Sequence, residues 1–255
     1  MPMDLVTIPC RSDNYAYLFH DAASGETALI DIPEAQPILD ELDRRGWTLS
    51  QIWITHHHPD HVEGLEGVLA KHPAPVTGGK ADAHRLPKLD RAVAEGDTLE
   101  IAGETGHVID VSGHTVGHLA FHFPESRVAF TADSLMAWGC GRVFEGTMPQ
   151  MWESLQKLAA LPPETVIASG HEYTTANGKF ALTIEPENPD YISRLKSVEA
   201  ARAAGEATVP SVLSEELLTN PFLRADTPEL REAIGMPDQP AADVFAEVRR
   251  RKDNF

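Results

Sequence analysis

The sequence predicts an α/β fold joined to a helical domain, and two observations carry that prediction. Short apolar runs of strand length alternate with helical segments until about residue 170. After His171 only helical patterns remain, so we expect no strand there. Strands mixed with helices, followed by helices alone, are typical of an α/β domain with a separate helical domain. We therefore predict domains at 1–171 and 172–255.

The order of elements supports this division. Strands are predicted at 3–9, 14–20, 27–31, 51–54, 76–77, 97–101, 107–111, 118–123, 127–131 and 165–168. Pro33 and Glu34 open a helix that Gly46 ends, because proline suits the first turn and glycine the residue after the last. Further helices or helical turns are predicted near 65–69 and at 81–86, 148–161, 173–183, 188–204, 211–218, 227–234 and 241–252. A glycine-rich loop spans 133–147.

Composition and charge narrow the classes of function. The chain has 255 residues, of which 42% are hydrophobic, enough for a sizeable core. Its formal net charge of −18 argues against binding to nucleic acid or to an anionic membrane. Residues 1–5 suggest no signal peptide, and no apolar stretch approaches the length of a membrane span. Because the two cysteines, Cys10 and Cys140, form no disulfide framework, we expect a cytoplasmic protein. We also expect the protein to be a monomer.

A histidine-rich loop follows the buried strand at 51–54. His56 and His58 alternate along an extended segment, so their imidazoles should point to one side. Asp60 and His61 come after a turn at Pro59 and can approach the same point from another direction. Imidazole and carboxylate together suit zinc, iron or manganese. The alternative is a polar surface turn, which explains one histidine better than four histidines and an aspartate.

Three further candidate ligands share that position at the end of a strand. His114, Asp133 and His171 each come directly after an apolar run and a small residue. In layered α/β folds this edge of the sheet collects ligands and catalytic groups. We therefore expect all three to belong to the same site.

Together the candidates offer more donors than one tetrahedral ion accepts. The predicted set is His56, His58, Asp60, His61, His114, Asp133 and His171. We expect His56, His58 and His114 to bind one ion, and we expect Asp60, His61 and His171 to bind another. Asp133 would bridge them, because a carboxylate has two oxygens. Two ions at roughly 3.5–4 Å are a known arrangement for hydrolysis.

The other histidines need no metal. His57 lies between two ligands in an extended segment and should point the other way. For His118 a supporting role behind the ligands stays open beside a structural one. The remaining five, interpreted as structural or solvated, are His20, His72, His84, His107 and His122.

Four motifs resemble the metallo-β-lactamase superfamily: T-H-x-H-x-D-H at 55–61, G-H-T-x-G-H at 113–118, the aspartate after F-T at 133, and G-H-E-Y at 170–173. A closer resemblance is to glyoxalase II, the hydroxyacylglutathione hydrolases, and it covers nearly the whole chain. It rests on further segments at 13–15, 139–147, 220–224 and 249–253. The resemblance implies a four-layer αββα sandwich with a C-terminal α-helical domain.

The same resemblance implies an activity, the hydrolysis of S-D-lactoylglutathione to D-lactate and glutathione, the second step of methylglyoxal detoxification. By motif position, substrate contacts fall on Arg142, Phe144, Tyr173, Arg249 and Lys252. Some members of the family have Lys and Tyr where this chain has Arg142 and Phe144. Arginine can still bind a carboxylate, whereas Phe144 lacks the hydroxyl. The family often reads Asp-Pro-Gly where this chain reads Asp31-Ile32-Pro33.

The predicted mechanism uses two divalent metal ions per chain, with zinc the first expectation and iron or manganese the alternatives. The ions, whose ligands include the catalytic carboxylates Asp60 and Asp133, would lower the pKa of a bridging water toward about 7. The resulting hydroxide would attack the thioester carbonyl, and one ion would stabilise the oxyanion. A thiol has a pKa of about 8.5, so the thiolate can leave without a general acid.

Several alternatives stay open beside this interpretation. Cys140 lies in the predicted substrate loop and could act as a nucleophile. The four consecutive cations at 249–252 could compensate a helix dipole or lie in solvent rather than bind substrate carboxylates. Other functions are a glutathione persulfide dioxygenase of the same superfamily, which does not load the second metal, a lactonase or β-lactamase, and a non-catalytic binder of glutathione conjugates.

Overall fold

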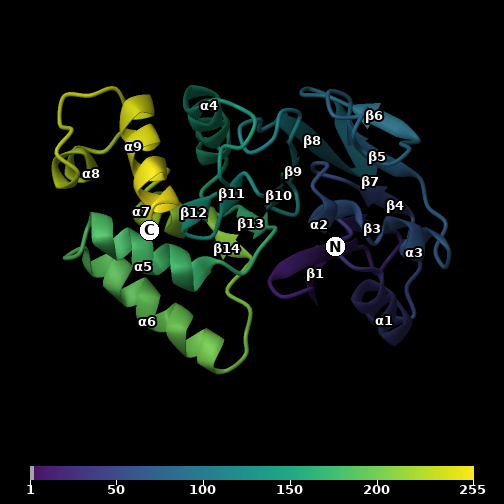
Figure 1. Cartoon of the computed structure of the whole chain (residues 1–255). Coiled ribbons are helices and arrows are strands. Elements are labelled where there is room, and N and C mark those ends of the chain that lie inside the picture. Colours follow the sequence, from purple (N-terminus) through teal and green to yellow (C-terminus); the bar gives the residue numbers. More distant parts are fainter. Residues whose placement is uncertain (1–2) are drawn as a thin grey trace. The chain divides into compact units, whose positions relative to one another are not determined.

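A computed structural model describes residues 3–255 (Figure 1). The chain forms two compact units. The first comprises the chain up to Asp110 together with Val116–Ala132, and the second comprises Val111–Thr115 and Asp133–Phe255. The domain boundary expected after residue 171 stays a prediction.

The first unit contains a six-stranded sheet whose strands lie in chain order. Its members are β1 (Asp4–Cys10), β2 (Asn14–His20), β3 (Thr27–Ile30), β4 (Gln51–Trp53), β5 (Val76–Gly79) and β6 (Arg91–Val93). β1 to β3 pair antiparallel, and β3 to β6 pair parallel. The parallel pairing brings the carboxyl ends of β3 and β4 to one edge, so residues after Ile30 and after Trp53 can meet there.

Helices cover the outer face of that sheet. α1 (Ala35–Arg45) connects β3 to β4, and α3 (Leu65–Leu69) precedes β5. Ile38 of α1 and Val68 of α3 are fully buried in one apolar cluster with Leu18 and Leu29 of the sheet. α1 ends at Gly46, whose φ of 69° is the left-handed conformation that glycine adopts most readily.

A second sheet in the first unit supplies the other half of the core. Its strands β7 (Thr98–Ile101), β8 (Glu104–Asp110), β9 (Leu119–Phe123) and β10 (Val128–Ala132) pair antiparallel in order. Aromatic rings join the two sheets: Phe123 of β9 lies 5.1 Å from Phe19 and stacks at 5.2 Å on Trp53. Gly106 of β8 is required here, because a Cβ would lie 2.4 Å from the Phe123 ring.

The second unit is mainly helical (Figure 1, teal to yellow). Its elements are the hairpin β11 (Leu135–Met136) and β12 (Gly139–Cys140), α4 (Met148–Ala159), the antiparallel pair β13 (Val166–Ser169) and β14 (Ser211–Val212), α5 (Thr174–Ile184), α6 (Pro189–Ala203), α7 (Leu213–Thr219), α8 (Pro228–Ala233) and α9 (Ala241–Asp253). α5 and α6 pack side by side, and Trp138, Ala181 and Tyr191 lie in their shared core. None of the helices in residues 3–255 combines the length and the apolar composition that crossing a membrane requires.

The structure corrects some element predictions. A strand does occur after His171: β14 pairs with β13, and the helix predicted from 211 begins at Leu213. Two residues are too few to show a strand pattern, so pairing rather than local preference forms this strand. β6 and the hairpin β11–β12 were also not predicted. The turn at 81–86 is present, with Leu86 N donating to Asp82 O.

Candidate metal centre

In the first unit, the loop after β4 brings the predicted histidines together. His56 and His61 are fully buried, and His61 lies in the single turn α2 (Pro59–Val62), which starts at a proline. His56 Nε2 lies 3.2 Å from His58 Nδ1. A tetrahedral ion with metal–nitrogen bonds of about 2.0–2.1 Å separates two nitrogens by about 3.4 Å. This pair therefore fits one metal ion.

Asp31, just past the end of β3, orients His61. Its Oδ2 lies 2.8 Å from His61 Nδ1 and accepts a 2.8 Å hydrogen bond from the Thr55 hydroxyl. Its Oδ1 accepts from the Thr55 backbone nitrogen at 2.8 Å. With Nδ1 facing a carboxylate, Nε2 is the nitrogen that His61 presents to a metal. The ligand atoms of Asp31, His56 and His61 all lie within 4.8 Å of one another.

Sequence reasoning missed Asp31 as a functional residue. In the sequence, Asp31 stood out only because Ile32 and Pro33 follow it where the family often has Pro-Gly. The available signal was its place directly after a buried strand, as for the other candidates. Because β3 and β4 pair parallel, that place adjoins the histidine loop.

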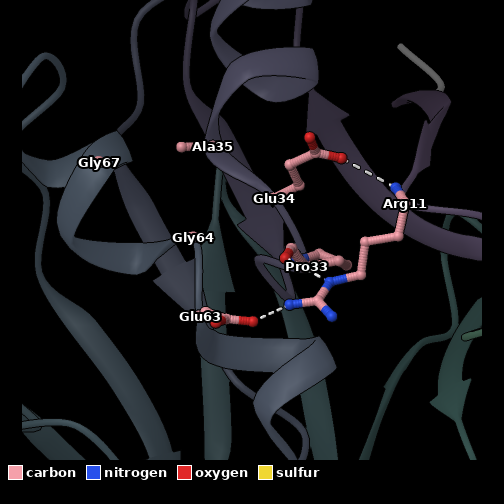
Figure 2. Close-up of a pocket in the computed structure, with 7 residues that line it drawn as sticks. All are labelled: Arg11, Pro33, Glu34, Ala35, Glu63, Gly64 and Gly67. Atoms are coloured by element: carbon pink, nitrogen blue, oxygen red, sulfur yellow. Dashed lines mark hydrogen bonds and ion pairs between the residues drawn. The ribbon is translucent and has the colours of Figure 1, made fainter.

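Main-chain and side-chain contacts tie the Asp31 segment to the His61 segment. Ile32 N donates to His61 O at 2.8 Å, and Gly64 N donates to Ile32 O at 2.9 Å. Figure 2 shows Arg11 reaching across both segments: Nε donates to Pro33 O at 2.9 Å, and the guanidinium pairs with Glu63. The Arg11 backbone nitrogen donates to Glu34 Oε2 at 2.9 Å. Arg11, Glu34 and Glu63 line a surface pocket, and their charged groups hold the Asp31 and His61 segments together.

Neighbouring residues fix the other members of the histidine loop. Asn14 Nδ2 donates to Asp60 Oδ2 at 3.0 Å. His57 Nδ1 lies 2.9 Å from Oδ2 of the buried Asp82, which agrees with the expectation that His57 points away from the ligands. The His118 ring stacks on His56 with centroids 4.5 Å apart, a contact that favours the supporting role left open for His118.

The second unit holds the other three predicted ligands around one carboxylate oxygen. Asp133 Oδ2 lies 3.2 Å from His171 Nε2 and 3.5 Å from His114 Nε2. His114 Nδ1 lies 2.8 Å from the carbonyl oxygen of Arg142 and donates to it, which leaves Nε2 as the metal-facing nitrogen. Gly141 permits this approach, because a Cβ there would lie 2.0 Å from Asp133 O.

Three of the predicted substrate residues lie in the same unit as the candidate ligands His114 and His171. The Phe144 ring, 62% exposed, lies 5.3 Å from the His114 ring. Tyr173 stacks on His171 at 4.7 Å. Arg142 extends into solvent, with Nε 3.7 Å from Asp253 Oδ1. Exposed aromatic rings therefore lie beside the candidate ligands His114 and His171.

The C-terminal cations of α9 have different environments. Arg250 and Arg251 pair with Glu247 one turn earlier, as expected for solvated groups. Lys252 donates to Ala176 O at 3.2 Å, and burial, followed by the charges of Arg249 and Arg142, lowers its pKa to about 8. Arg249 is only 3% exposed. A ligand can therefore reach Lys252 more easily than Arg249.

Cys140 does not have the properties of a nucleophile. Its side chain is buried, and burial raises the pKa of the thiol to about 11. At neutral pH the group is a thiol, which attacks carbonyls far less readily than a thiolate. The cysteine alternative is therefore disfavoured.

Comparisons with known proteins agree with the predicted fold and superfamily. The model of the metallo-beta-lactamase superfamily matches residues 14–171, and the fold and site define a member of that superfamily. The crystal structure of ETHE1 from Myxococcus xanthus has the same fold, with a TM-score of 0.66 at 22% identity, covering 100% of both chains. That of TTHA1623 in a di-iron-bound form has a TM-score of 0.57 at 26% identity, covering 66% of this chain and 91% of that chain.

Sequence relatives identify the family. The model for the hydroxyacylglutathione hydrolase C-terminus matches residues 172–255. Hydroxyacylglutathione hydrolases from Cereibacter sphaeroides and Ruegeria pomeroyi are 60% and 58% identical, covering 100% of this chain and of each relative. The chain belongs to the hydroxyacylglutathione hydrolase family. The predicted family, the αββα fold with a helical C-terminal domain, and the hydrolase class are thereby confirmed.

Proposed function

We propose that the protein hydrolyses the thioester of S-D-lactoylglutathione, and of related S-2-hydroxyacylglutathiones, to a 2-hydroxy acid and glutathione. The observation that carries this proposal is full-length identity of about 60% to relatives that bear the name hydroxyacylglutathione hydrolase. The proposal is supported by the positions of the seven predicted ligand residues, which lie in the segments that follow β4, β8, β10 and β13. The reaction would form the second step of methylglyoxal detoxification.

The proposed site uses the seven predicted donors to bind two divalent ions. His56, His58 and His114 would bind one, Asp60, His61 and His171 the other, and Asp133 would be shared. The 3.2 Å separation of His56 and His58 nitrogens supports the first set. One oxygen of Asp133 approaches both His114 and His171, and this supports a role for Asp133 as a ligand of both ions. Imidazole and carboxylate donors suit zinc, our first expectation, as well as iron and manganese.

Bound ions would supply Lewis acidity and a water that ionises near neutral pH. The chain's residues orient that chemistry: Asp31 and the Arg142 carbonyl fix which nitrogen His61 and His114 present. Phe144 and Tyr173 offer apolar contact beside the ligands. Arg142 and Lys252 offer positive charge to the carboxylates of glutathione. The thiolate of glutathione needs no proton donor to leave.

The competing functions are separated by one experiment. The metal-loaded protein would be mixed with S-D-lactoylglutathione, and loss of thioester absorbance and release of free thiol would be followed, with a chelator-treated control. Rapid, chelator-sensitive hydrolysis is expected. Oxygen uptake on glutathione persulfide without hydrolysis would instead identify a dioxygenase, and binding without turnover would identify a glutathione-conjugate binder. The cytoplasmic location and the monomeric state stay predictions.

A further inference from the structure

The ammonium group of Lys252, in the last turn of α9, contacts a carbonyl oxygen and two aromatic rings. Its Nζ donates to Ala176 O of α5 at 3.2 Å. The same nitrogen lies 5.3 Å from the centre of the Phe180 ring and 5.1 Å from the centre of the Phe255 ring. Within about 6 Å a cation is attracted by the negative face of an aromatic ring. These contacts hold a long side chain that would otherwise sample many rotamers.

The two rings meet at an angle and enclose the ammonium on two sides. Their centroids lie 5.6 Å apart, with an interplanar angle of 63°. Phe180 is 1% exposed and stacks on Phe222 at 6.0 Å, so this ring is part of the core. Phe255 is 64% exposed, so the other ring lies at the surface. We call Phe180 and Phe255 the aromatic corner.

Burial does not explain why Phe255 lies in this position. The hydrophobic effect scales with the apolar area removed from water, and most of this ring stays in water. The main chain instead bends back after α9: Phe255 N donates to Lys252 O and Asn254 N donates to Arg251 O, both at 3.3 Å. Asn254 Nδ2 also donates to Arg250 O at 2.7 Å. The bend brings the Phe255 ring against the ammonium of Lys252.

The aromatic corner adjoins the helix that begins beside the proposed site. α5 follows Tyr173, a predicted substrate contact whose ring stacks on the candidate metal ligand His171 at 4.7 Å. Ala176 lies in the first turn of α5, and Phe180 lies one turn further along. The ammonium of Lys252 is therefore fixed against the helix whose start carries a predicted substrate contact.

The contacts of Lys252 leave its ammonium able to bind an anion. An ammonium has three N–H donors, and within residues 3–255 only Ala176 O accepts from this one. The aromatic rings attract the charge without using a donor. Lys252 is also half-buried, so an ion pair between it and a carboxylate is weakened less by water than a fully exposed pair.

We propose that Phe255 is a positioning residue for glutathione thioesters, which together with Phe180 holds the ammonium of Lys252 in place to bind a carboxylate of the glutathione moiety. This inference deepens the proposed hydrolase function and rests on it. Lys252 is the substrate contact, and the aromatic corner acts through it. Because the corner touches this charge rather than the candidate metal ligands, Phe255 should affect KM for glutathione thioesters and leave the chemical step alone.

The test replaces the Phe255 ring in three ways. Phe255→Leu keeps an apolar side chain but removes the aromatic face. Replacement of Phe255 by pentafluorophenylalanine keeps the shape of the ring but removes its negative face. Phe255→Tyr keeps the face, and the exposure of the ring leaves its hydroxyl in solvent. The matched control is Leu218→Ala, which truncates another exposed apolar side chain, on α7.

Three measurements on each metal-loaded protein separate positioning from chemistry. KM and kcat would be measured on S-D-lactoylglutathione and on S-lactoyl-N-acetylcysteamine, which lacks the glutathione carboxylates. Calorimetry would give Kd for S-methylglutathione, a thioether that keeps the carboxylates and has no thioester to hydrolyse. The melting temperature would show whether each variant is folded.

For Phe255→Leu and for the pentafluorinated ring, we expect KM for S-D-lactoylglutathione and Kd for S-methylglutathione to rise about two- to fivefold, the effect of one cation–π contact near the surface. KM for S-lactoyl-N-acetylcysteamine should not rise. Phe255→Tyr should retain the wild-type KM and Kd, because it keeps the aromatic face, and so should Leu218→Ala. Unchanged KM and Kd in Phe255→Leu, or an equal rise in KM for both thioesters, would overturn the proposal.

A double variant shows whether Phe255 acts through Lys252. In Lys252→Met the ammonium is gone, so adding Phe255→Leu should raise KM for S-D-lactoylglutathione no further. If the two single effects instead multiply, Phe255 acts independently of Lys252 and the proposal fails. A wild-type protein that binds S-methylglutathione but hydrolyses no thioester would overturn the proposed function, whereas weaker binding by Phe255→Leu in that case would still support the positioning role.

Discussion

The Asp31 carboxylate lies 2.8 Å from His61 Nδ1, and both residues are buried. The contact joins the end of one parallel strand to the loop that follows the next. It selects which imidazole nitrogen His61 can offer to a metal. A carboxylate partner also makes the imidazole a stronger electron donor, so the second ion of the proposed site should depend on Asp31.

Asp31→Asn should therefore weaken metal retention. We expect a loss of about 10–100-fold in affinity for the ion that His61 would bind, because the amide cannot orient or polarise His61 as the carboxylate does. Chelator competition against the wild type measures this. Asp40→Asn, an exposed carboxylate on α1, is the matched control and should change nothing. Equal retention in Asp31→Asn and Asp40→Asn would contradict the assigned role.

Replacing Asp133 should cost more than replacing any single histidine. Its Oδ2 approaches His114 and His171, which belong to different proposed ligand sets, so its loss affects both ions. We expect Asp133→Ala to retain less metal than His171→Ala and to lose at least ~100-fold in kcat, the scale on which removal of one well-placed electrostatic group acts. Metal analysis and turnover check this. Metal content equal to wild type in Asp133→Ala would exclude a shared carboxylate.

The candidate metal ligands could be chosen from the sequence because each of them obeys a local rule. His114, Asp133 and His171 follow apolar strand runs, and the histidine loop follows another. The rule depends only on the strand and the residues after it, both visible in the chain. Asp31 obeys the same rule, but its partner His61 lies 30 residues away in the sequence, and only the folded chain brings the two together.

The side-chain contacts to the main chain of the hairpin β11–β12 could not be predicted in this way. Asn220 lies 84 and 81 residues from the carbonyls it bonds, and Arg249 lies 109 residues from Cys140. Glu216 sits in a helix, where a glutamate usually means a solvated face. Its complete burial depends on Arg194 and the Trp138 backbone, contacts that only the folded chain defines. The strand β14 likewise exists because Val166 and Ile167 pair with it.

Lys252 should make activity depend on pH. Its pKa is lowered to about 8, so the ammonium is present below pH 8 and lost as the pH rises through that value. If the charge binds a glutathione carboxylate, kcat/KM for S-D-lactoylglutathione should fall above about pH 8, because this ratio reports the free enzyme. Lys252→Met should remove that step. S-lactoyl-N-acetylcysteamine, a thioester that lacks the glutathione carboxylates, serves as the control substrate, and the same fall with it would assign the step to another group.

Gly141→Ala should disturb the metal ligands directly. The added methyl would lie 2.0 Å from Asp133 O and 2.9 Å from His114 Nδ1. Because backbone must move to relieve this overlap, we expect the free energy of unfolding to fall by about 1–3 kcal/mol or more, with reduced metal retention. Urea denaturation and metal analysis measure the two effects. Gly205→Ala, whose Cβ meets no atom within 4 Å, should leave metal retention intact even though its φ of 77° adds strain.

Phe144→Tyr should improve substrate binding without changing stability. The ring is 62% exposed and lies beside His114, so a hydroxyl can be added without burying it. A tyrosine hydroxyl at this position would offer a donor that Phe144 lacks, and one hydrogen bond contributes about 0.5–1.5 kcal/mol. We therefore expect KM for S-D-lactoylglutathione to fall about two- to tenfold, with unchanged kcat and melting temperature. The same change on S-lactoyl-N-acetylcysteamine would show that the hydroxyl binds the acyl part rather than glutathione. An unchanged KM on both substrates would remove Phe144 from the proposed substrate contacts.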